Sequence, residues 1–402
     1  MKPLMRTWAA VDLSAIEQNF RAVQAYTRRS CKIMCVVKAD AYGHGSLYVA
    51  KTLEALSADY LAVSSVDEAM QLRDGGITLP ILILGYTPPE FCGLLLAHDI
   101  AQTVYDVDSA RILSDIAVES NKKLTVHIKV DTGMSRLGFS AGLAATIDDI
   151  SAISRLPGLV SEGIFTHFAA SDDVESSFTE LQFSRFCEVL SALSSLGITF
   201  PIRHAANSGA TLNFPDTWLD MVRVGILLYG LVPEASLTQK IHLVPAMQLN
   251  SSVSQLRSLA KGTPVSYSGT YVAPSDRLLA VLPIGYADGL SRALSNCGLF
   301  RIDGVDCPVV GNVCMDMCMV DVTDVPAVKS GDKAVLFGTE GQPIEVIAEI
   351  CKTINYEVTC LIGKRVLRIY YKEGREVGCF NYISPSTISE KLPLITTEKA
   401  AK

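Results

Sequence analysis

The sequence predicts two domains, an α/β barrel followed by an all-β domain, and three observations support this. The length of 402 residues exceeds the usual size of one domain. The first part alternates short apolar runs with amphipathic stretches, and the last part contains alternating segments separated by glycine. We expect the barrel domain at residues 1–237, the β domain at 238–383 and a flexible tail at 384–402. The residues before the first helix are also compatible with the β domain.

Eight apolar runs in the first part are candidate strands. They are Ile33–Lys38, Tyr60–Ser65, Ile81–Gly85, Ala101–Tyr105, Leu124–Val130, Gly163–Phe168, Ile202–Ala206 and Met221–Leu228. Stretches with helical periodicity lie between them, at Ser46–Leu56, Asp67–Arg73, Ser109–Glu119 and Phe178–Leu196. Eight successive strand–helix units predict a closed parallel (β/α)₈ barrel, the TIM-barrel fold. An open doubly wound sheet is the alternative, but no G-x-G-x-x-G follows a strand.

Further segments complete the predicted organisation. Ser14 and Glu17 form a capping-box pattern that predicts a helix reaching about Arg28. Leu231–Lys240 lacks periodicity and is predicted to be a linker. The strands expected in the second domain are Ala246–Val253, Arg277–Leu282, Asp306–Val310, Met317–Val322 and Asp332–Phe337.

The composition excludes several classes of protein. A net charge of −7 gives no basic surface for nucleic acid. No apolar run approaches the roughly 20 residues that span a bilayer, and no signal sequence opens the chain, so we expect a cytoplasmic protein. Eleven cysteines suit a reducing compartment. The pairs Cys31/Cys35 and Cys314/Cys318 lack histidines at zinc-ligand spacing, so we expect buried apolar side chains and no metal.

The most informative segment is Ile33–Gly45, an apolar run that ends in Lys38, Tyr42 and glycines. Side chains at the end of a parallel strand face the ligand side of an α/β protein. A desolvated lysine amine there has a lowered pKa and is nucleophilic, as a Schiff base requires. A lysine that extends into water is the alternative.

This segment, VVKADAYGHG, resembles the cofactor-lysine motif of alanine racemases, which use pyridoxal 5'-phosphate. KVDTGMSRLGF, THFA, HAANS and VRVGILLYG match other motifs of that family, so the resemblance extends from about Thr7 to Tyr371. It implies that pyridoxal phosphate binds Lys38 and that the enzyme interconverts L-alanine and D-alanine. In bacteria this reaction supplies D-alanine for peptidoglycan.

The phosphate site implied by the resemblance combines strand ends of the barrel with one residue of the second domain. Tyr42 and Tyr356 match the phosphate-contacting tyrosines of the family. Ser208 and the backbone near Gly225 and Ile226 offer short neutral donors for a dianion.

Arg223 matches the arginine that faces the pyridine nitrogen in similar racemases. Because arginine keeps its proton, the ring nitrogen would stay unprotonated and the cofactor would be a weaker electron sink. Simple proton return should then be favoured over transamination. By the same resemblance, His204 supports Arg223 and His167 faces the cofactor ring.

The substrate carboxylate is assigned to Arg136, whose planar fork suits it. Lys129 would repel that arginine if it remained a cation. In many family members the matching lysine is carbamylated, which makes it an anion; a solvated lysine is the alternative here.

Racemisation also needs a base on the opposite face of the substrate. The segment PIGYADG matches the family motif for that base, so the resemblance implies that Tyr286 is the second base beside Lys38. In the family this tyrosine and the match of Met315 serve the neighbouring subunit, which predicts a two-fold homodimer. Asn312 is a departure, because family members commonly carry arginine there, and it puts the entrance corridor in doubt.

Three alternatives remain open. A racemase of serine or several small amino acids would use the same machinery, because a pocket lined by Tyr356 and Ile354 rejects an added hydroxyl by roughly a hundredfold at best. A non-catalytic pyridoxal-phosphate protein shares the barrel but lacks a second domain. A related two-domain decarboxylase ranks last.

Overall fold

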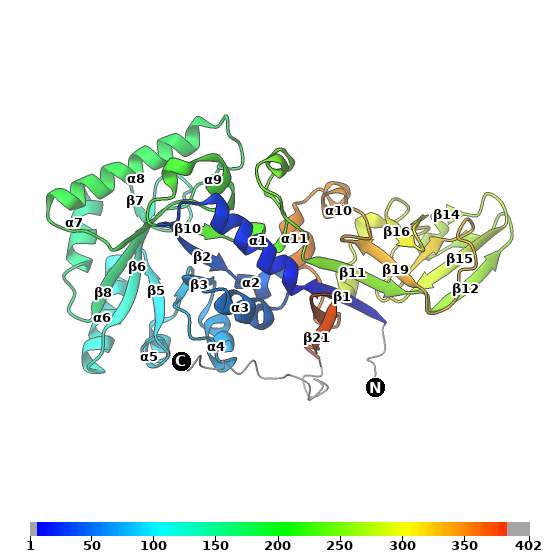
Figure 1. The fold of residues 1–402 in the computed structure, drawn as a ribbon, viewed down its shortest axis with the longest axis horizontal. Helices are drawn as coiled ribbons and strands as arrows, with labels where there is room; N and C mark the ends of the chain where they lie inside the picture. The colour runs from blue at the N-terminus through cyan, green and yellow to red at the C-terminus, as the bar shows by residue number, and fades with distance from the viewer. Residues whose placement is uncertain (1–5, 384–402) are drawn as a thin grey trace, which may run out of the picture. The chain divides into compact units, whose positions relative to one another are not determined.

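The computed structural model describes residues 6–383, so the predicted tail at 384–402 lies outside the described residues. The chain divides into two compact units. The barrel unit comprises residues 16–42 and 46–244, and the second unit contains residues 6–15, 43–45 and 245–383 of the described chain (Figure 1).

The barrel unit contains the eight parallel strands that the sequence predicts. They are β2 (Lys32–Val36), β3 (Tyr60–Val63), β4 (Ile81–Ile83), β5 (Ile100–Val104), β6 (Leu124–Asp131), β8 (Leu159–Phe165), β9 (Ile202–His204) and β10 (Met221–Val224). They pair in the order β10-β2-β3-β4-β5-β6-β8-β9. The ends of this sheet meet where the Asp220 N–H donates to Arg203 O, at 3.0 Å, and the Arg223 N–H donates to Ala206 O, at 2.9 Å. The predicted barrel is confirmed.

Helices cover the outside of this sheet. The main ones are α3 (Ser46–Ala55), α4 (Val66–Asp74), α5 (Cys92–Ala97), α6 (Val107–Glu119), α7 (Ala144–Ile153), α8 (Ser177–Ser195) and the short α9 (Ser208–Asn213). Figure 1 shows α6, α7 and α8 outside strands β5, β6 and β8. Several of these helices begin at an N-cap residue. At the beginning of α6, the Asp106 side chain accepts a hydrogen bond from the Ser109 N–H.

The second unit is built on a seven-stranded sheet in the order β17-β16-β19-β11-β1-β20-β21. Its strands are β1 (Thr7–Asp12), β11 (Met247–Ser252), β16 (Leu299–Ile302), β17 (Val305–Pro308), β19 (Lys333–Phe337), β20 (Leu367–Lys372) and β21 (Arg375–Phe380). A smaller sheet joins β12 (Gln255–Leu259), β15 (Arg277–Leu282) and β18 (Cys318–Asp321), and β13 (Pro264–Val265) pairs with β14 (Tyr271–Val272). The five predicted strands of this domain are confirmed.

Two details differ from the prediction. Helices α10 (Ile344–Cys351) and α11 (Asn355–Cys360) lie within the second unit, so it is rich in sheet but not purely β. The capping box at Ser14 is wrong. Helix α1 (Leu13–Tyr26) begins one residue earlier, and the Asp12 carboxylate accepts from the Ser14 N–H at 2.8 Å. The Ser14 hydroxyl accepts instead from the Glu373 N–H.

The eleven cysteines all carry free thiols. Within residues 6–383, no three side chains of His, Cys, Asp or Glu gather as a metal site. In the same range no helix combines the length and apolar character needed to cross a membrane.

Candidate active site

Lys38 lies two residues after the end of β2, half-buried, at the start of the segment labelled α2 (Lys38–Tyr42). This segment is a left-handed turn, since Ala39, Asp40, Ala41 and Tyr42 have φ between 51° and 55°. L-residues adopt this conformation rarely and at a cost of about 1–2 kcal/mol each. Two contacts help to hold it: the Ala39 N–H donates to Glu68 at 2.7 Å, and the Asp40 carboxylate accepts from the Ser46 N–H at 2.8 Å. Strain maintained at a strand end is typical of functional sites.

Tyr42, at the end of this turn, packs against β10 and the segment that follows it. Its ring lies 4.9 Å from that of Tyr229, whose hydroxyl donates to Val36 O. A Cβ added to Gly225 would lie 2.4 Å from the Tyr42 hydroxyl, so this close approach requires glycine. The Gly225 N–H donates to the Ser208 hydroxyl at 3.0 Å, and Ile226 follows directly. Small neutral donors thus gather here, which suits a phosphate group.

Arg223 is buried, and its two terminal nitrogens donate hydrogen bonds to four acceptors. Its Nη2 donates to the carbonyls of Thr166, at 2.8 Å, and Ala205, at 3.0 Å, and to His167 Nδ1 at 3.1 Å. Its Nη1 donates to His204 Nδ1 at 3.1 Å. No carboxylate takes part in these contacts, so the guanidinium is oriented by neutral groups.

Burial and nearby cations keep the two histidines neutral. Burial, with the charge of Arg223 next in importance, holds the pKa of His167 and His204 well below the ordinary value. Burial, reinforced by Arg136, lowers the pKa of Arg223 to about 9, so the guanidinium remains protonated at neutral pH. Phe165 stacks on His204 with ring centroids 4.6 Å apart and lies beneath Arg223. The arginine therefore donates to both rings.

Lys129 lies on β6 and is buried, with its Nζ donating to Val130 O at 2.7 Å. Burial first, then Arg223 and Arg136, lower the pKa of Lys129 to about 7, against an opposing effect of Asp131. Arg136 is exposed on the loop after β6. Asp131 shapes that loop by accepting hydrogen bonds from the Gly133 and Ser135 N–H groups, both at 3.0 Å. A large fraction of Lys129 is uncharged near neutral pH.

In the second unit, Tyr286 and Met315 lie side by side. Tyr286 opens the short helix η6 (Tyr286–Asp288), and its N–H donates to Cys314 O at 3.0 Å. The Ala287 N–H donates to Met315 O at 3.1 Å, and a Cβ on Gly285 would lie 2.3 Å from that oxygen. Both side chains are exposed, Tyr286 by 45% and Met315 by 53%. Met315 belongs to an exposed surface that also includes Tyr267 and Met317.

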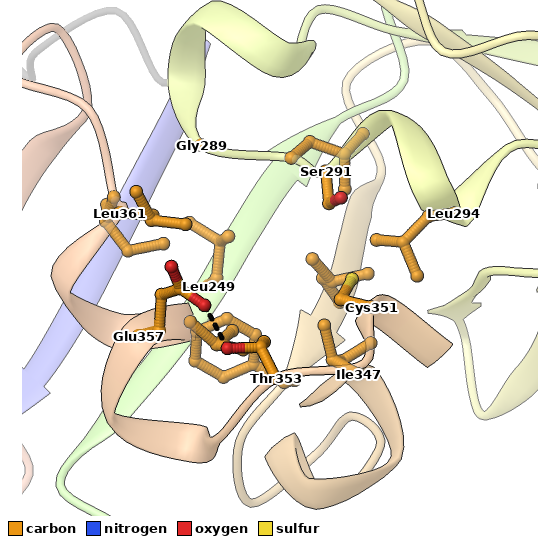
Figure 2. Close-up of a pocket in the computed structure, with 14 residues that line it drawn as sticks. Leu249, Gly289, Ser291, Leu294, Ile347, Cys351, Thr353, Glu357 and Leu361 are labelled. Carbon is orange, nitrogen blue, oxygen red and sulfur yellow. Dashed lines mark hydrogen bonds between the residues drawn. The ribbon is translucent and has the colours of Figure 1, made fainter. Parts of the chain in front are cut away.

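Tyr356 lies on α11, which together with α10 contributes residues to a small apolar pocket in the second unit. Figure 2 shows Leu249, Ile347 and Leu361 in this pocket, with a hydrogen bond from Thr353 to Glu357 at its edge. Tyr356 does not line the pocket. We therefore assign the pocket to the packing of α10 and α11.

Asn312 lies near the exposed apolar surface of the second unit, where its side-chain amide donates to Tyr267 O at 2.8 Å. An arginine at this position would extend further and carry charge, so the local network of this chain differs from the common family pattern.

The structure gathers most of the predicted site at one end of the barrel. The charges of four basic groups lower the pKa of His167, which places them near this histidine: Arg223, Arg136, Lys129 and Lys38. Tyr42, Ser208, Gly225 and Ile226 form the neutral cluster beside them. Tyr286, Met315 and Tyr356 belong to the second unit. Sequence reasoning missed three residues: His127, which contacts His204, and Glu162 and Tyr60, which contact His127 and each other. The one indication in the sequence was that His127 and Lys129 are two residues apart in a strand, so their side chains lie on the same face.

Comparison with known proteins gives consistent matches. The model of the alanine racemase N-terminal domain matches residues 11–233, and that of the C-terminal domain matches residues 246–370. The chain is 44% identical over 367 residues to an alanine racemase of Desulforamulus reducens, which covers 90% of this chain and 98% of that protein. It is 44% identical over 380 residues to an alanine racemase of Clostridium perfringens, with 94% and 98% covered.

Solved structures agree. An alanine racemase of Clostridium difficile 630 superposes with a TM-score of 0.93 at 38% identity, covering 95% of this chain and 100% of that one. An alanine racemase of Bartonella henselae, solved with covalently bound pyridoxal phosphate, gives a TM-score of 0.81 at 29% identity, with 91% and 99% covered.

Proposed function

Because this chain belongs to the alanine racemase family, we propose that it interconverts L-alanine and D-alanine with pyridoxal 5'-phosphate. The observation that carries this proposal is the buried Arg223, oriented by neutral histidines and backbone carbonyls at the same end of the barrel as Lys38. The enzyme would act in the cytoplasm and supply D-alanine for peptidoglycan.

The residues at the barrel end fit this cofactor. Tyr42, Ser208 and the N–H groups of Gly225 and Ile226 would hold its phosphate. Tyr356 is added to this set by the family resemblance alone. Lys38 would hold its carbonyl carbon covalently, and His167 would face its ring. When bound, pyridoxal phosphate delocalises the electron pair left on the substrate α-carbon after a proton is removed.

Arg223 would limit how far that delocalisation goes if it faces the ring nitrogen. Its guanidinium would donate a hydrogen bond and keep its proton, so that nitrogen would stay unprotonated. Proton return to the α-carbon is then favoured over other outcomes.

Lys38 and Tyr286 are the two bases in this proposal, one on each face of the α-carbon. The Lys38 amine would remove or return a proton on one side, and the Tyr286 hydroxyl would do so on the other. We propose that Tyr286 and Met315 complete the site of a neighbouring protomer in a homodimer. The exposure of both side chains supports this, and Met315 lies beside exposed Tyr267 and Met317, an apolar surface of the kind that commonly marks interfaces.

Arg136 would bind the substrate carboxylate, and Lys129 would orient it after carbamylation. In that step the neutral Nζ attacks the carbon of carbon dioxide, a C–N bond forms, and one C=O π bond opens with its electron pair moving to oxygen. One N–H bond then breaks and its proton passes to solvent. The product is an anion that attracts Arg136. The low pKa of Lys129 supports this, because only the uncharged amine reacts.

Chiral chromatography of alanine incubated with the purified protein and pyridoxal phosphate tests the proposed function. Either pure enantiomer should become an equal mixture, since the two have equal free energies, and Lys38→Ala protein should convert neither. Borohydride treatment and peptide mapping should find the cofactor on Lys38. Recovery of unchanged alanine would exclude the activity, and faster conversion of L-serine than of L-alanine would reassign the substrate.

A further inference from the structure

Behind Arg223, a chain of hydrogen bonds crosses the interior of the barrel. His204 Nε2 lies 2.9 Å from His127 Nδ1, and His127 Nε2 lies 3.1 Å from Glu162 Oε2. The same carboxylate oxygen accepts a hydrogen bond from the Tyr60 hydroxyl. Both histidines are fully buried, whereas the Glu162 side chain is 30% exposed. The chain thus joins a partly solvated carboxylate to the buried arginine.

The donor and acceptor of each hydrogen bond in this series follow from the groups at its two ends, Arg223 and Glu162. Arg223 can only donate, so His204 Nδ1 must accept and His204 Nε2 must carry the hydrogen. His127 Nδ1 then accepts from His204, and His127 Nε2 carries the hydrogen that it donates to Glu162. An ionised carboxylate accepts only, so it agrees with this order.

The ionisation states support the same order. Hydrogen bonding by His127 lowers the pKa of Glu162, which keeps the carboxylate charged. Burial lowers the pKa of His127, and burial followed by Glu162 raises that of Tyr60. The two imidazoles are therefore neutral and the phenol keeps its proton.

The strands are shaped to admit this chain. The pairing of β6 with β8 shifts between Val126 and His127, so that His127 stands opposite Gly163 and Glu162 is an extra residue in β8. A Cβ on Gly163 would lie 2.2 Å from His127 Nδ1, so only glycine leaves room for the ring. An irregular strand and a glycine thus occur where the chain of hydrogen bonds needs them.

We propose that Glu162 is a positioning residue for Arg223, acting through the tautomers of His127 and His204. Without the carboxylate, Arg223 alone favours the original tautomers, so a second form becomes populated in which His127 and His204 both carry the hydrogen on Nδ1. The hydrogen on His204 would face the Nη1 donor of Arg223, and the two donors repel. Glu162 thereby keeps an acceptor in front of the arginine. This inference rests on the proposed function, because the arginine matters only if it faces the cofactor.

Three variants distinguish the contributions of the hydrogen bonds made by Glu162. Glu162→Leu removes the acceptor for His127. Glu162→Gln keeps an acceptor oxygen at the same place while removing the charge. Tyr60→Phe is the matched control, since it removes the other donor to Glu162 and leaves the histidine contact intact.

Nitrogen NMR of the imidazoles reads the tautomers directly, with and without cofactor. The chain has six histidines, so selective ¹⁵N labelling gives few signals. In the unmodified protein, His127 and His204 should both be protonated at Nε2. Glu162→Leu should populate the Nδ1-protonated forms, and the other two variants should not. An Nδ1 hydrogen on His204 in the unmodified protein would overturn the proposal, even if no variant folded.

Racemase kinetics supply the second readout. Glu162→Leu should lower kcat by about tenfold to a hundredfold, as small misplacements in an active site do. KM should change little, because Arg223 does not bind the substrate carboxylate. Glu162→Gln and Tyr60→Phe should remain within about threefold of the unmodified enzyme. An unchanged kcat in folded Glu162→Leu protein would overturn the positioning role. An unmodified protein that shows the predicted tautomers but no racemase activity would instead reject the proposed function.

Discussion

The Asp288 carboxylate accepts a hydrogen bond from the Gly285 N–H at 2.9 Å and closes the turn that presents Tyr286. Asp288 is completely buried and also pairs with two arginines, Arg6 at 2.9 Å and Arg365 at 2.8 Å. The Asp288 carboxylate therefore connects the turn to two other segments of the second unit, which contain Arg6 and Arg365.

Replacing Asp288 by asparagine should loosen this turn. We expect the free energy of unfolding to fall by about 1–3 kcal/mol. The two arginines lose their counter-charge, and the amide N–H₂ of the new asparagine faces an N–H group that the carboxylate had accepted from. Racemisation should slow as well, since Tyr286 is no longer held in place. Chemical denaturation and steady-state kinetics measure the two effects. Asp306→Asn, which breaks the exposed pair with Arg301, is the matched control and should have a much smaller effect, because exposed ion pairs contribute little. Equal effects of the two substitutions would show that the buried pair has no special role.

Gly225→Ala should weaken cofactor binding. The new methyl carbon would lie 2.4 Å from the Tyr42 hydroxyl, and the tyrosine would have to move away from the neutral donor cluster. We expect the dissociation constant for pyridoxal phosphate to rise at least about tenfold, the effect of losing one charge-assisted hydrogen bond. Fluorescence titration of cofactor-free protein measures it. Gly93→Ala places a methyl group where no atom lies within 4 Å and should leave binding unchanged. An unaltered affinity in Gly225→Ala protein would contradict the assignment of the cofactor phosphate to this cluster.

Carbamylation of Lys129 should increase as the pH rises through about 7. Below its pKa the amine is protonated and has no lone pair for carbon dioxide; above it, the neutral amine reacts. ¹³C NMR with labelled bicarbonate should therefore show a carbamate signal that grows through this range and is missing in Lys129→Ala protein. The same signal in that variant would assign the carbamate to another amine.

The sequence was sufficient for the barrel because each strand is a buried apolar run with clear ends. Its limits are local. The pattern at Ser14 and Glu17 resembles a capping box, yet Asp12, at the end of β1, stands closer to the first free N–H groups of α1. Helices α10 and α11 are too short to show several turns of periodicity.

The candidate site was predicted unevenly for a physical reason. Lys38 could be argued from its own segment, because a strand end positions it. Tyr286 could be named only through the family resemblance, since nothing in its local sequence marks a base. Tyr60, His127 and Glu162 lie on three strands, and only the folded barrel reveals their contacts.

Mixing two inactive variants should restore activity if the site is shared between protomers. Lys38→Ala lacks one base and Tyr286→Phe lacks the other, so a mixed dimer would regain one complete site. Activity after subunit exchange, with exchange itself followed by native mass spectrometry, measures this. Mixed dimers that form without recovering activity would place both bases in one protomer.

The central claim is that Lys38 and Tyr286 act on opposite faces of the substrate. Tyr286→Phe removes one base and leaves the other, so racemisation should fall by about 100- to 10,000-fold. By analogy with the family, Lys38 serves the D-face.

Deuterium incorporation from heavy water, measured by mass spectrometry on each enantiomer with the Tyr286→Phe enzyme, tests this claim most directly. D-alanine should exchange its α-hydrogen with retention of configuration, while L-alanine stays nearly unlabelled. Equal labelling of the two enantiomers would contradict the account, because one group or water would then reach both faces.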